Sequence, residues 1–217
     1  MALGAVPVPA VLGPDDDDFL MHTPPVWHWQ VPVSPLPGVG HADPERRAYL
    51  WIPPRCVAVR GLVVGLENME EQPMFDDPVI RAALTDSCLG IVWVAPGEAT
   101  GDNAGPNMAL SLDPDAPNML AGAVPAGKTA DEQCADELAA LVDELAAKSG
   151  YTELVTAPMI LVGHSAATPF VWGRTVYKSG RLRGRVIGLL SYKGWYPASA
   201  PADVPILHVS SEWEEVR

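Results

Sequence analysis

The stretch Met159-Ile160-Leu161-Val162-Gly163-His164-Ser165-Ala166-Ala167 decides the fold of this chain. Its first four residues are apolar and predict a short strand that is buried on both faces. Small residues and a serine follow, and residues 168–177 are compatible with a helix. The sequence therefore predicts a strand, a sharp turn and a helix, with Ser165 at the tip of the turn.

The small residues around Ser165 suit a turn in which the strand and the helix nearly touch. Gly163, Ala166 and Ala167 leave room for that approach, although a second glycine is usual at the position of Ala167. Such a turn lifts the serine hydroxyl above the sheet edge, into the positive field of the helix N-terminus. An ordinary turn with serine as the N-cap residue is the alternative, and the flanking pattern favours the first interpretation.

The order of elements around Gly163-His164-Ser165-Ala166-Ala167 resembles that of α/β-hydrolases of the esterase and dienelactone-hydrolase-like kind. The resemblance covers residues 49–214. It implies an α/β fold with a mostly parallel central sheet flanked by helices. It also implies a carboxylic-ester hydrolase with Ser165 as the nucleophile, acting on a small-molecule ester.

The resemblance further implies an oxyanion hole made of two backbone N–H groups. One belongs to Ala166, and the other comes from the loop after the first buried core strand, which begins at Leu66, Glu67 and Asn68. A backbone donor requires no particular side chain, so the choice within this loop stays open, and the Asn68 side chain is a further option. His164, beside the serine, is included among the binding candidates.

The last strand is expected at residues 205–210, and the acidic member of the triad is expected after it. Glu214 stands at the position that the resemblance assigns to the acid, with Glu212 and Glu215 as alternatives. A charged helix start is an equally good interpretation of these three glutamates.

The catalytic histidine is the main obstacle to this interpretation. In a hydrolase triad the order along the chain is serine, acid, histidine, and the histidine takes the serine proton. No histidine follows Glu214; the five present are His22, His28, His41, His164 and His208. We therefore expect a chain truncated before its catalytic histidine and inactive by itself. The alternative is a non-catalytic α/β-hydrolase-like domain that binds a small molecule or a partner, or an inactive fragment.

The remaining pattern predicts the other elements of the sheet. Strands are expected at 26–33 (at a sheet edge because of its prolines), 47–52, 57–65, 90–95 and 185–191. Helices are expected at 76–84, with Val79, Ile80, Ala83 and Leu84 on one face, and at 129–150. The second helix has a capping box at Thr129 and Glu132, a stop at Gly150 and an apolar stripe consisting of Cys134, Leu138, Leu141, Val142 and Leu145.

This pattern divides the chain into an N-terminal extension with an edge strand (1–46) and an incomplete α/β-hydrolase core (47–217). Residues 97–128 lack periodicity and predict a long loop insertion, either facing the substrate or disordered.

Composition excludes several classes of function. Fourteen basic and 27 acidic residues give 14 − 27 = −13, a charge that repels nucleic acid. No apolar run approaches the roughly 20 residues of a membrane span. The three cysteines show no metal-ligand spacing and support no disulfide framework, and the sequence implies no metal or cofactor.

Localisation, oligomeric state and substrate identity stay open. The apolar N-terminus lacks the basic residue of a signal peptide, so secretion would require a signal peptide absent from this chain. Aromatic residues near the expected site would suit a sugar-bearing or aromatic ester, and they suit packing equally well: Trp172, Trp195, Tyr196 and Trp213.

Overall fold

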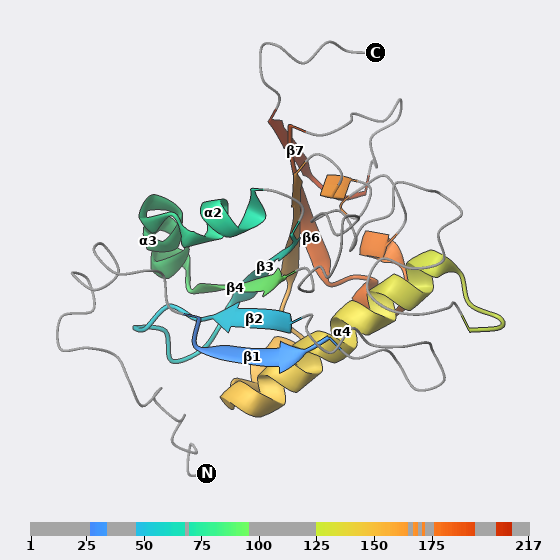
Figure 1. Cartoon of the computed structure of the whole chain (residues 1–217), viewed down its shortest axis with the longest axis horizontal. Helices are drawn as coiled ribbons and strands as arrows, with labels where there is room; N and C mark the ends of the chain where they lie inside the picture. The colour runs from blue at the N-terminus through green and yellow to red at the C-terminus, as the bar shows by residue number, and fades with distance from the viewer. Residues whose placement is uncertain are drawn as a thin grey trace, which may run out of the picture.

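In the part of the chain that the structure describes, a seven-stranded sheet forms the centre (Figure 1). The computed structural model describes residues 27–33, 47–67, 70–95, 125–164, 167–168, 171, 176–193 and 203–209. The strands are β1 (Trp29–Pro32), β2 (Arg47–Trp51), β3 (Gly61–Leu66), β4 (Leu89–Val94), β5 (Met159–His164), β6 (Val186–Tyr192) and β7 (Ile206–Val209).

The strands lie in the order β1-β2-β4-β3-β5-β6-β7. Every pairing among β3, β4, β5, β6 and β7 is parallel, while β2 pairs antiparallel with both β1 and β4. These pairings confirm the predicted α/β fold with a mostly parallel sheet, and they place β1 at an edge as its prolines predicted.

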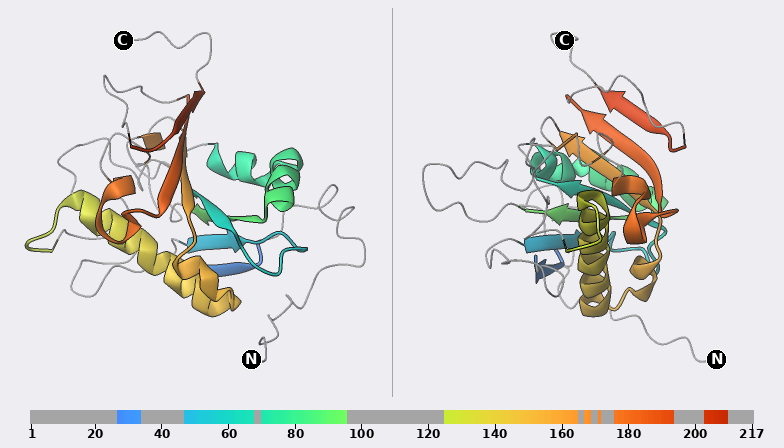
Figure 2. Two further views of the ribbon diagram at one scale, coloured as in Figure 1. Left: turned by 180° about the vertical axis from the view of Figure 1, so that it is seen from behind. Right: turned by 90° about the vertical axis from the view of Figure 1, so that its right-hand side faces the viewer.

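Helices cover both faces of this sheet. Two of them, α2 (Glu71–Asp76) and α3 (Pro78–Ser87), connect β3 to β4, and α4 (Ala130–Ser149) precedes β5. Figures 1 and 2 show α4 on one side of the sheet and α2 with α3 on the other. Short 3₁₀ turns lie in two of the other connections: η2 (Thr152–Val155) between α4 and β5, and η5 (Val176–Lys178) and η6 (Gly180–Leu182) between β5 and β6.

The structure of α4 confirms its prediction. The side chain of Thr129 accepts a hydrogen bond from the N–H of Glu132, whose carboxylate accepts from the N–H of Thr129. Gly150 ends the helix in the left-handed region, with φ of 82°. All five residues of the predicted apolar stripe are buried. Among them Cys134 is a core thiol that forms no disulfide bond, as expected.

The prediction for the helix at 76–84 is partly wrong. The helix α3 starts later, after Asp77, whose carboxylate caps it by accepting from Val79 and Ile80. Val79 is 76% exposed, and Arg81 is buried instead. The guanidinium of Arg81 stacks on Trp27 and Trp51, with its Cζ 5.0 and 4.9 Å from the ring centroids.

Two compensating interactions explain why a charged residue faces the sheet. Arg81 forms an ion pair with Asp76 at 3.1 Å and donates from Nε to the carbonyl of Phe75 at 2.7 Å. Phe75 comes from the unpredicted helix α2, and it fills the space that a side chain at Gly65 would occupy.

A disulfide bond between Cys56 and Cys88 joins the segment before β3 to the start of β4. The sequence supported no disulfide framework, because pairing depends on a three-dimensional approach that spacing does not reveal. The two Cα atoms lie 5.6 Å apart, although the residues are 32 positions apart in the sequence.

The structure describes only parts of the predicted N-terminal extension and of the predicted loop insertion. β1 belongs to the proposed extension at 1–46, yet it pairs with β2 of the core in one sheet. Of the predicted insertion at 97–128, residues 97–124 lie outside the described residues.

Candidate functional site

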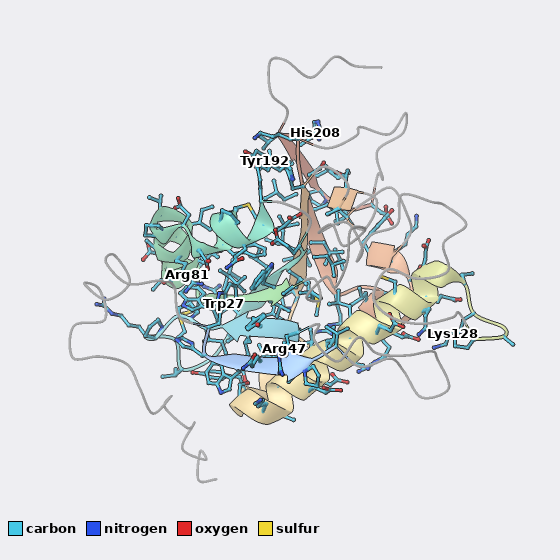
Figure 3. The ribbon with its side chains drawn as sticks, in the orientation of Figure 1. Trp27, Arg47, Arg81, Lys128, Tyr192 and His208 are labelled. Atoms are coloured by element: carbon cyan, nitrogen blue, oxygen red, sulfur yellow. A yellow bond between two sulfur atoms is a disulfide. The ribbon has the colours of Figure 1, made fainter. Side chains whose placement is uncertain are left out.

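The carboxyl ends of β5, β6 and β7 meet at one edge of the sheet. Gly163 and His164 of β5 pair with Ser191 and Tyr192 of β6, and Ser191 pairs with His208 of β7. Figure 3 shows Tyr192 and His208 at this end of the sheet. Ligand crevices of open α/β sheets lie outside the carboxyl ends of the strands, so this edge is the candidate site.

Gly163 marks a sharp change of direction at the end of β5. A Cβ placed on it would lie 2.6 Å from the carbonyl oxygen of Ala167 and 2.6 Å from Cγ2 of Val171. Ala167 and Val171 therefore lie close to the end of the strand that precedes them. Ser165 and Ala166 come between in the sequence and lie outside the described residues.

A buried glutamate from α2 contacts the last residue of β5. Oε1 of Glu71 accepts a hydrogen bond from the backbone N–H of His164 at 2.7 Å. Glu71 is 0% exposed and His164 is 6% exposed. Sequence reasoning missed Glu71, because it lies 93 residues from its partner and no local motif marks it.

A second cluster, which consists of Glu70, Lys193 and His164, links the start of α2 to the ends of β5 and β6 and is more exposed. Nζ of Lys193 lies 3.4 Å from both carboxylate oxygens of Glu70, and one of these oxygens is 3.8 Å from Nε2 of His164. The His164 ring also packs against Tyr192, with the centroids 5.3 Å apart. Hydrogen bonding to Tyr192 and Glu70 raises the pKa of Lys193. His164 therefore faces α2 rather than the opposite side of the sheet.

Ser191 and His208 lie on the opposite face of the sheet from His164, because neighbouring residues of a strand alternate between faces. Nδ1 of His208 and Oγ of Ser191 are 3.2 Å apart, and Ser191 is fully buried. The sequence placed His208 inside a strand, and the structure confirms that position in β7.

The other oxyanion donors were predicted in a loop beginning at Leu66. That boundary is wrong by one residue, because Leu66 is the last residue of β3 and pairs with Val94. The N–H of Glu67 donates to the carbonyl of Val94 at 2.9 Å, so it is already engaged in the sheet. Asn68 lies outside the described residues.

The carboxylate of Glu67 is buried beside α2. Its Oε2 accepts from the N–H of Gln72 and from Nε1 of Trp93, each at 2.7 Å. Burial raises the pKa of Glu67, the hydrogen bond from Trp93 opposes this shift, and the charge of Glu71 adds to it.

The predicted acid and several aromatic residues are not among the described residues. They are Glu214 with its alternatives Glu212 and Glu215, and the aromatic residues Trp172, Trp195, Tyr196 and Trp213.

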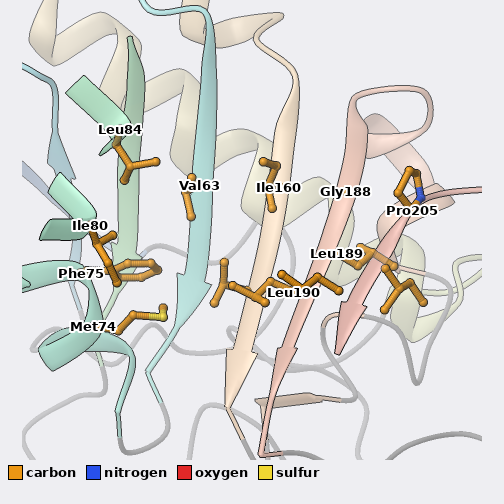
Figure 4. A pocket seen from close by; sticks show the side chains of 13 residues that line it. Val63, Met74, Phe75, Ile80, Leu84, Ile160, Gly188, Leu189, Leu190 and Pro205 are labelled. Carbon is orange, nitrogen blue, oxygen red and sulfur yellow. The ribbon is translucent and has the colours of Figure 1, made fainter. Parts of the chain in front are cut away.

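An apolar groove of about 510 Å³ lies on the sheet face that carries α2 and α3 (Figure 4). Met74 and Phe75 form one wall, and Ile160, Leu190 and Leu207 of three successive strands form the floor. None of the residues that line the groove has an ionisable side chain, so the groove suits apolar groups.

Two further properties concern the described part of the chain. Within it, no group of three or more His, Cys, Asp or Glu side chains is placed to hold a metal ion. Nor does any helix found there have the length and apolar character needed to cross a bilayer.

Comparison with known proteins gives structural likenesses alone. No protein-family model matches the sequence, and no curated protein does either. An esterase from Pyrobaculum calidifontis is 16% identical with a TM-score of 0.41, over 83% of this chain and 50% of its own. A thermostable carboxyl esterase from Bacillus coagulans is 12% identical with a TM-score of 0.42, over 78% and 46% respectively.

A lipase in its open form is 15% identical with a TM-score of 0.38, over 76% of this chain and 44% of its own. The chain thus spans about half the length of the solved structures that it matches.

Proposed function

We propose that this chain carries the nucleophile of a carboxylic-ester hydrolase, with Ser165 attacking the acyl carbon of a small-molecule ester. The observation that supports this most is the approach of Ala167 and Val171 to Gly163 at the end of a central parallel strand. A reversal of this kind, with a serine between glycine and alanine, suits a hydroxyl presented above the sheet.

In this proposal two backbone N–H groups stabilise the oxyanion that forms on the substrate. One is the N–H of Ala166. For the other we favour Asn68 over Leu66 and Glu67, since Leu66 belongs to β3 and the N–H of Glu67 donates to Val94.

Glu214 is proposed to orient the histidine that takes the serine proton, and that histidine is not assigned to a residue of this sequence. A sugar-bearing ester gains no support here, since the aromatic residues cited for it lie outside the described part of the chain.

A fluorophosphonate probe tests the proposed nucleophile. The protein, expressed from its complete reading frame, should be labelled on the peptide that contains Ser165. Labelling should disappear in Ser165→Ala and after heat denaturation. A folded protein that the probe leaves unlabelled would contradict the proposal and favour a non-catalytic binding domain.

We also infer that the chain folds in an oxidising compartment, because structural disulfide bonds such as Cys56–Cys88 are rare in cytosolic proteins. Protein isolated from its natural source and denatured without reductant should keep Cys56 and Cys88 protected from alkylation. Alkylation of both residues before reduction would contradict this inference.

A further inference from the structure

We propose that Glu71 is a positioning residue that fixes the backbone where the turn to Ser165 begins. This inference rests on the proposed function, because Ser165 is the residue whose position it would secure. The Glu71 carboxylate bonds the N–H of His164, which directly precedes the serine in the sequence.

The sheet itself explains why a side chain is needed at this point. Pairing of β5 with β3 runs from Met159–Leu62 to Val162–Gly65, whereas pairing with β6 continues as far as His164–Tyr192. β3 ends at Leu66, and the chain then leads into α2. The carboxylate of Glu71 thus takes the place that a strand carbonyl holds earlier in the ladder.

The burial of both groups makes this bond costly to lose. A buried N–H without an acceptor costs about 1–3 kcal/mol, and hydrogen bonds to a carboxylate are stronger than neutral ones. Since burying a carboxylate is itself unfavourable, a simple packing role would be served better by an apolar residue. The energetics therefore point to the acceptor, rather than to the bulk, of Glu71.

The effect on the reaction follows from the distance dependence of catalysis. A displacement of about 1 Å at a reacting group costs on the order of 100-fold in rate. If His164 loses its acceptor, its backbone can move, and the next residue moves with it. Substrate binding would change little, because Glu71 is fully buried and does not meet the solvent.

Glu153 provides a matched control at the opposite end of the sheet. Its Oε1 accepts from the backbone N–H of Val59 at 2.8 Å, just before β3 begins. The two glutamates thus make the same kind of long-range bond, but only Glu71 bonds the residue that precedes Ser165 in the sequence.

The experiment compares Glu71→Gln, Glu71→Met, Glu71→Asp and Glu153→Met in the protein from its complete reading frame. Two quantities are measured: the rate constant of fluorophosphonate labelling at Ser165, per folded molecule, and the exchange rate of the His164 amide proton. The second quantity does not depend on catalysis.

We expect Glu71→Met to lower the labelling rate constant at least about tenfold and to speed exchange of the His164 amide by a similar factor. Gln keeps an acceptor oxygen, so Glu71→Gln should restore both quantities to within about threefold of the wild type. Glu153→Met should destabilise the fold but leave labelling within about twofold.

Unchanged labelling in folded Glu71→Met, or equal loss in the Gln and Met variants, would overturn the proposal. Should Glu71→Met not fold, Glu71→Asp replaces it, because its side chain is one methylene shorter and draws the acceptor away. If the wild type is not labelled at all, the proposed function fails, and amide exchange alone decides whether Glu71 holds the backbone.

Discussion

Gly163 accepts no side chain, because a Cβ there would lie 2.6 Å from both a carbonyl oxygen and a methyl carbon. We expect Gly163→Ala to lower the free energy of unfolding by about 1–3 kcal/mol, as overpacking does, and to suppress labelling of Ser165. Urea unfolding measures the first effect, and the fluorophosphonate probe measures the second.

Gly188 of β6 is the control for this substitution. A Cβ there would have Ile160 as its nearest neighbour, with carbon atoms at 3.5 and 3.8 Å. Since glycine weakens a strand by roughly 0.5–1 kcal/mol relative to alanine, Gly188→Ala should be neutral or stabilising. Equal destabilisation by both substitutions would show that the close approach at Gly163 is not the cause.

Glu67 predicts a pH dependence of stability near the candidate site. Burial raises its pKa in the folded protein above the unfolded value of 4.5, so folding favours the protonated form. Its contribution to stability is therefore greatest below pH 4.5 and is lost as pH rises through the folded pKa.

The variant Glu67→Gln keeps an acceptor for Gln72 and Trp93 and removes the charge. The difference obtained by subtracting the free energy of unfolding of the wild type from that of Glu67→Gln should increase from pH 4 to pH 8. Chemical denaturation at several pH values checks this, and a constant difference between the two proteins would contradict it.

At the scale of elements, a partly buried histidine just before β1 bonds the residue that follows β2 by one position. Burial, with a smaller effect of Arg81, lowers the pKa of His28 to about 4. Nδ1 of His28 can then accept from the N–H of Ile52, at 3.4 Å. Because the folded pKa lies below the unfolded value of 6.5, this stabilisation is present above pH 6.5 and is lost as pH falls toward 4.

Asn in place of His28 offers an acceptor that does not titrate. Relative to His28→Asn, the wild type should lose stability between pH 6.5 and pH 4, by at most about 3 kcal/mol. Tryptophan fluorescence during urea unfolding measures the free energy of unfolding of both proteins at each pH. Parallel pH profiles of the two proteins would exclude the role of His28.

The sequence predicts some elements better than others. The well-predicted ones carry their signals within their own residues. The buried strands are continuous apolar runs, and α4 carries its cap, stripe and stop within its own sequence, so each was predicted. The helix α2 has six residues including Pro73, which is too short for a periodic pattern. The face of α3 was misjudged because Arg81 is buried only through partners outside that helix.

The candidate site shows the same division. The close approach of Ala167 to Gly163 arises within four residues, so the small residues of that stretch are a local signal for it. The bond from Glu71 to His164 spans 93 residues, and the Cys56–Cys88 bond spans 32. Such contacts depend on the finished fold, so the sequence alone gives no signal for them.

At the scale of the whole molecule, the two faces of the sheet are covered unequally. One face packs against α4 in a core that extends from Val31 to Leu189. The other core, around Phe75 and Val162, lies under α2 and α3. Beyond it no described helix covers β6 and β7, and the groove of about 510 Å³ opens there, beside Leu207 at 62% exposure.

An apolar surface of this kind should bind the aromatic rings of an amphipathic dye in the native state. We expect the folded protein to enhance the fluorescence of anilinonaphthalene sulfonate at neutral pH, and Leu207→Glu to reduce that signal by placing a charge at the groove. Val57 is the matched control, because it is 81% exposed and lies outside the groove. Val57→Glu changes the net charge equally, so an equal reduction in both variants would mean that general repulsion of the anionic dye, rather than the groove, sets its binding.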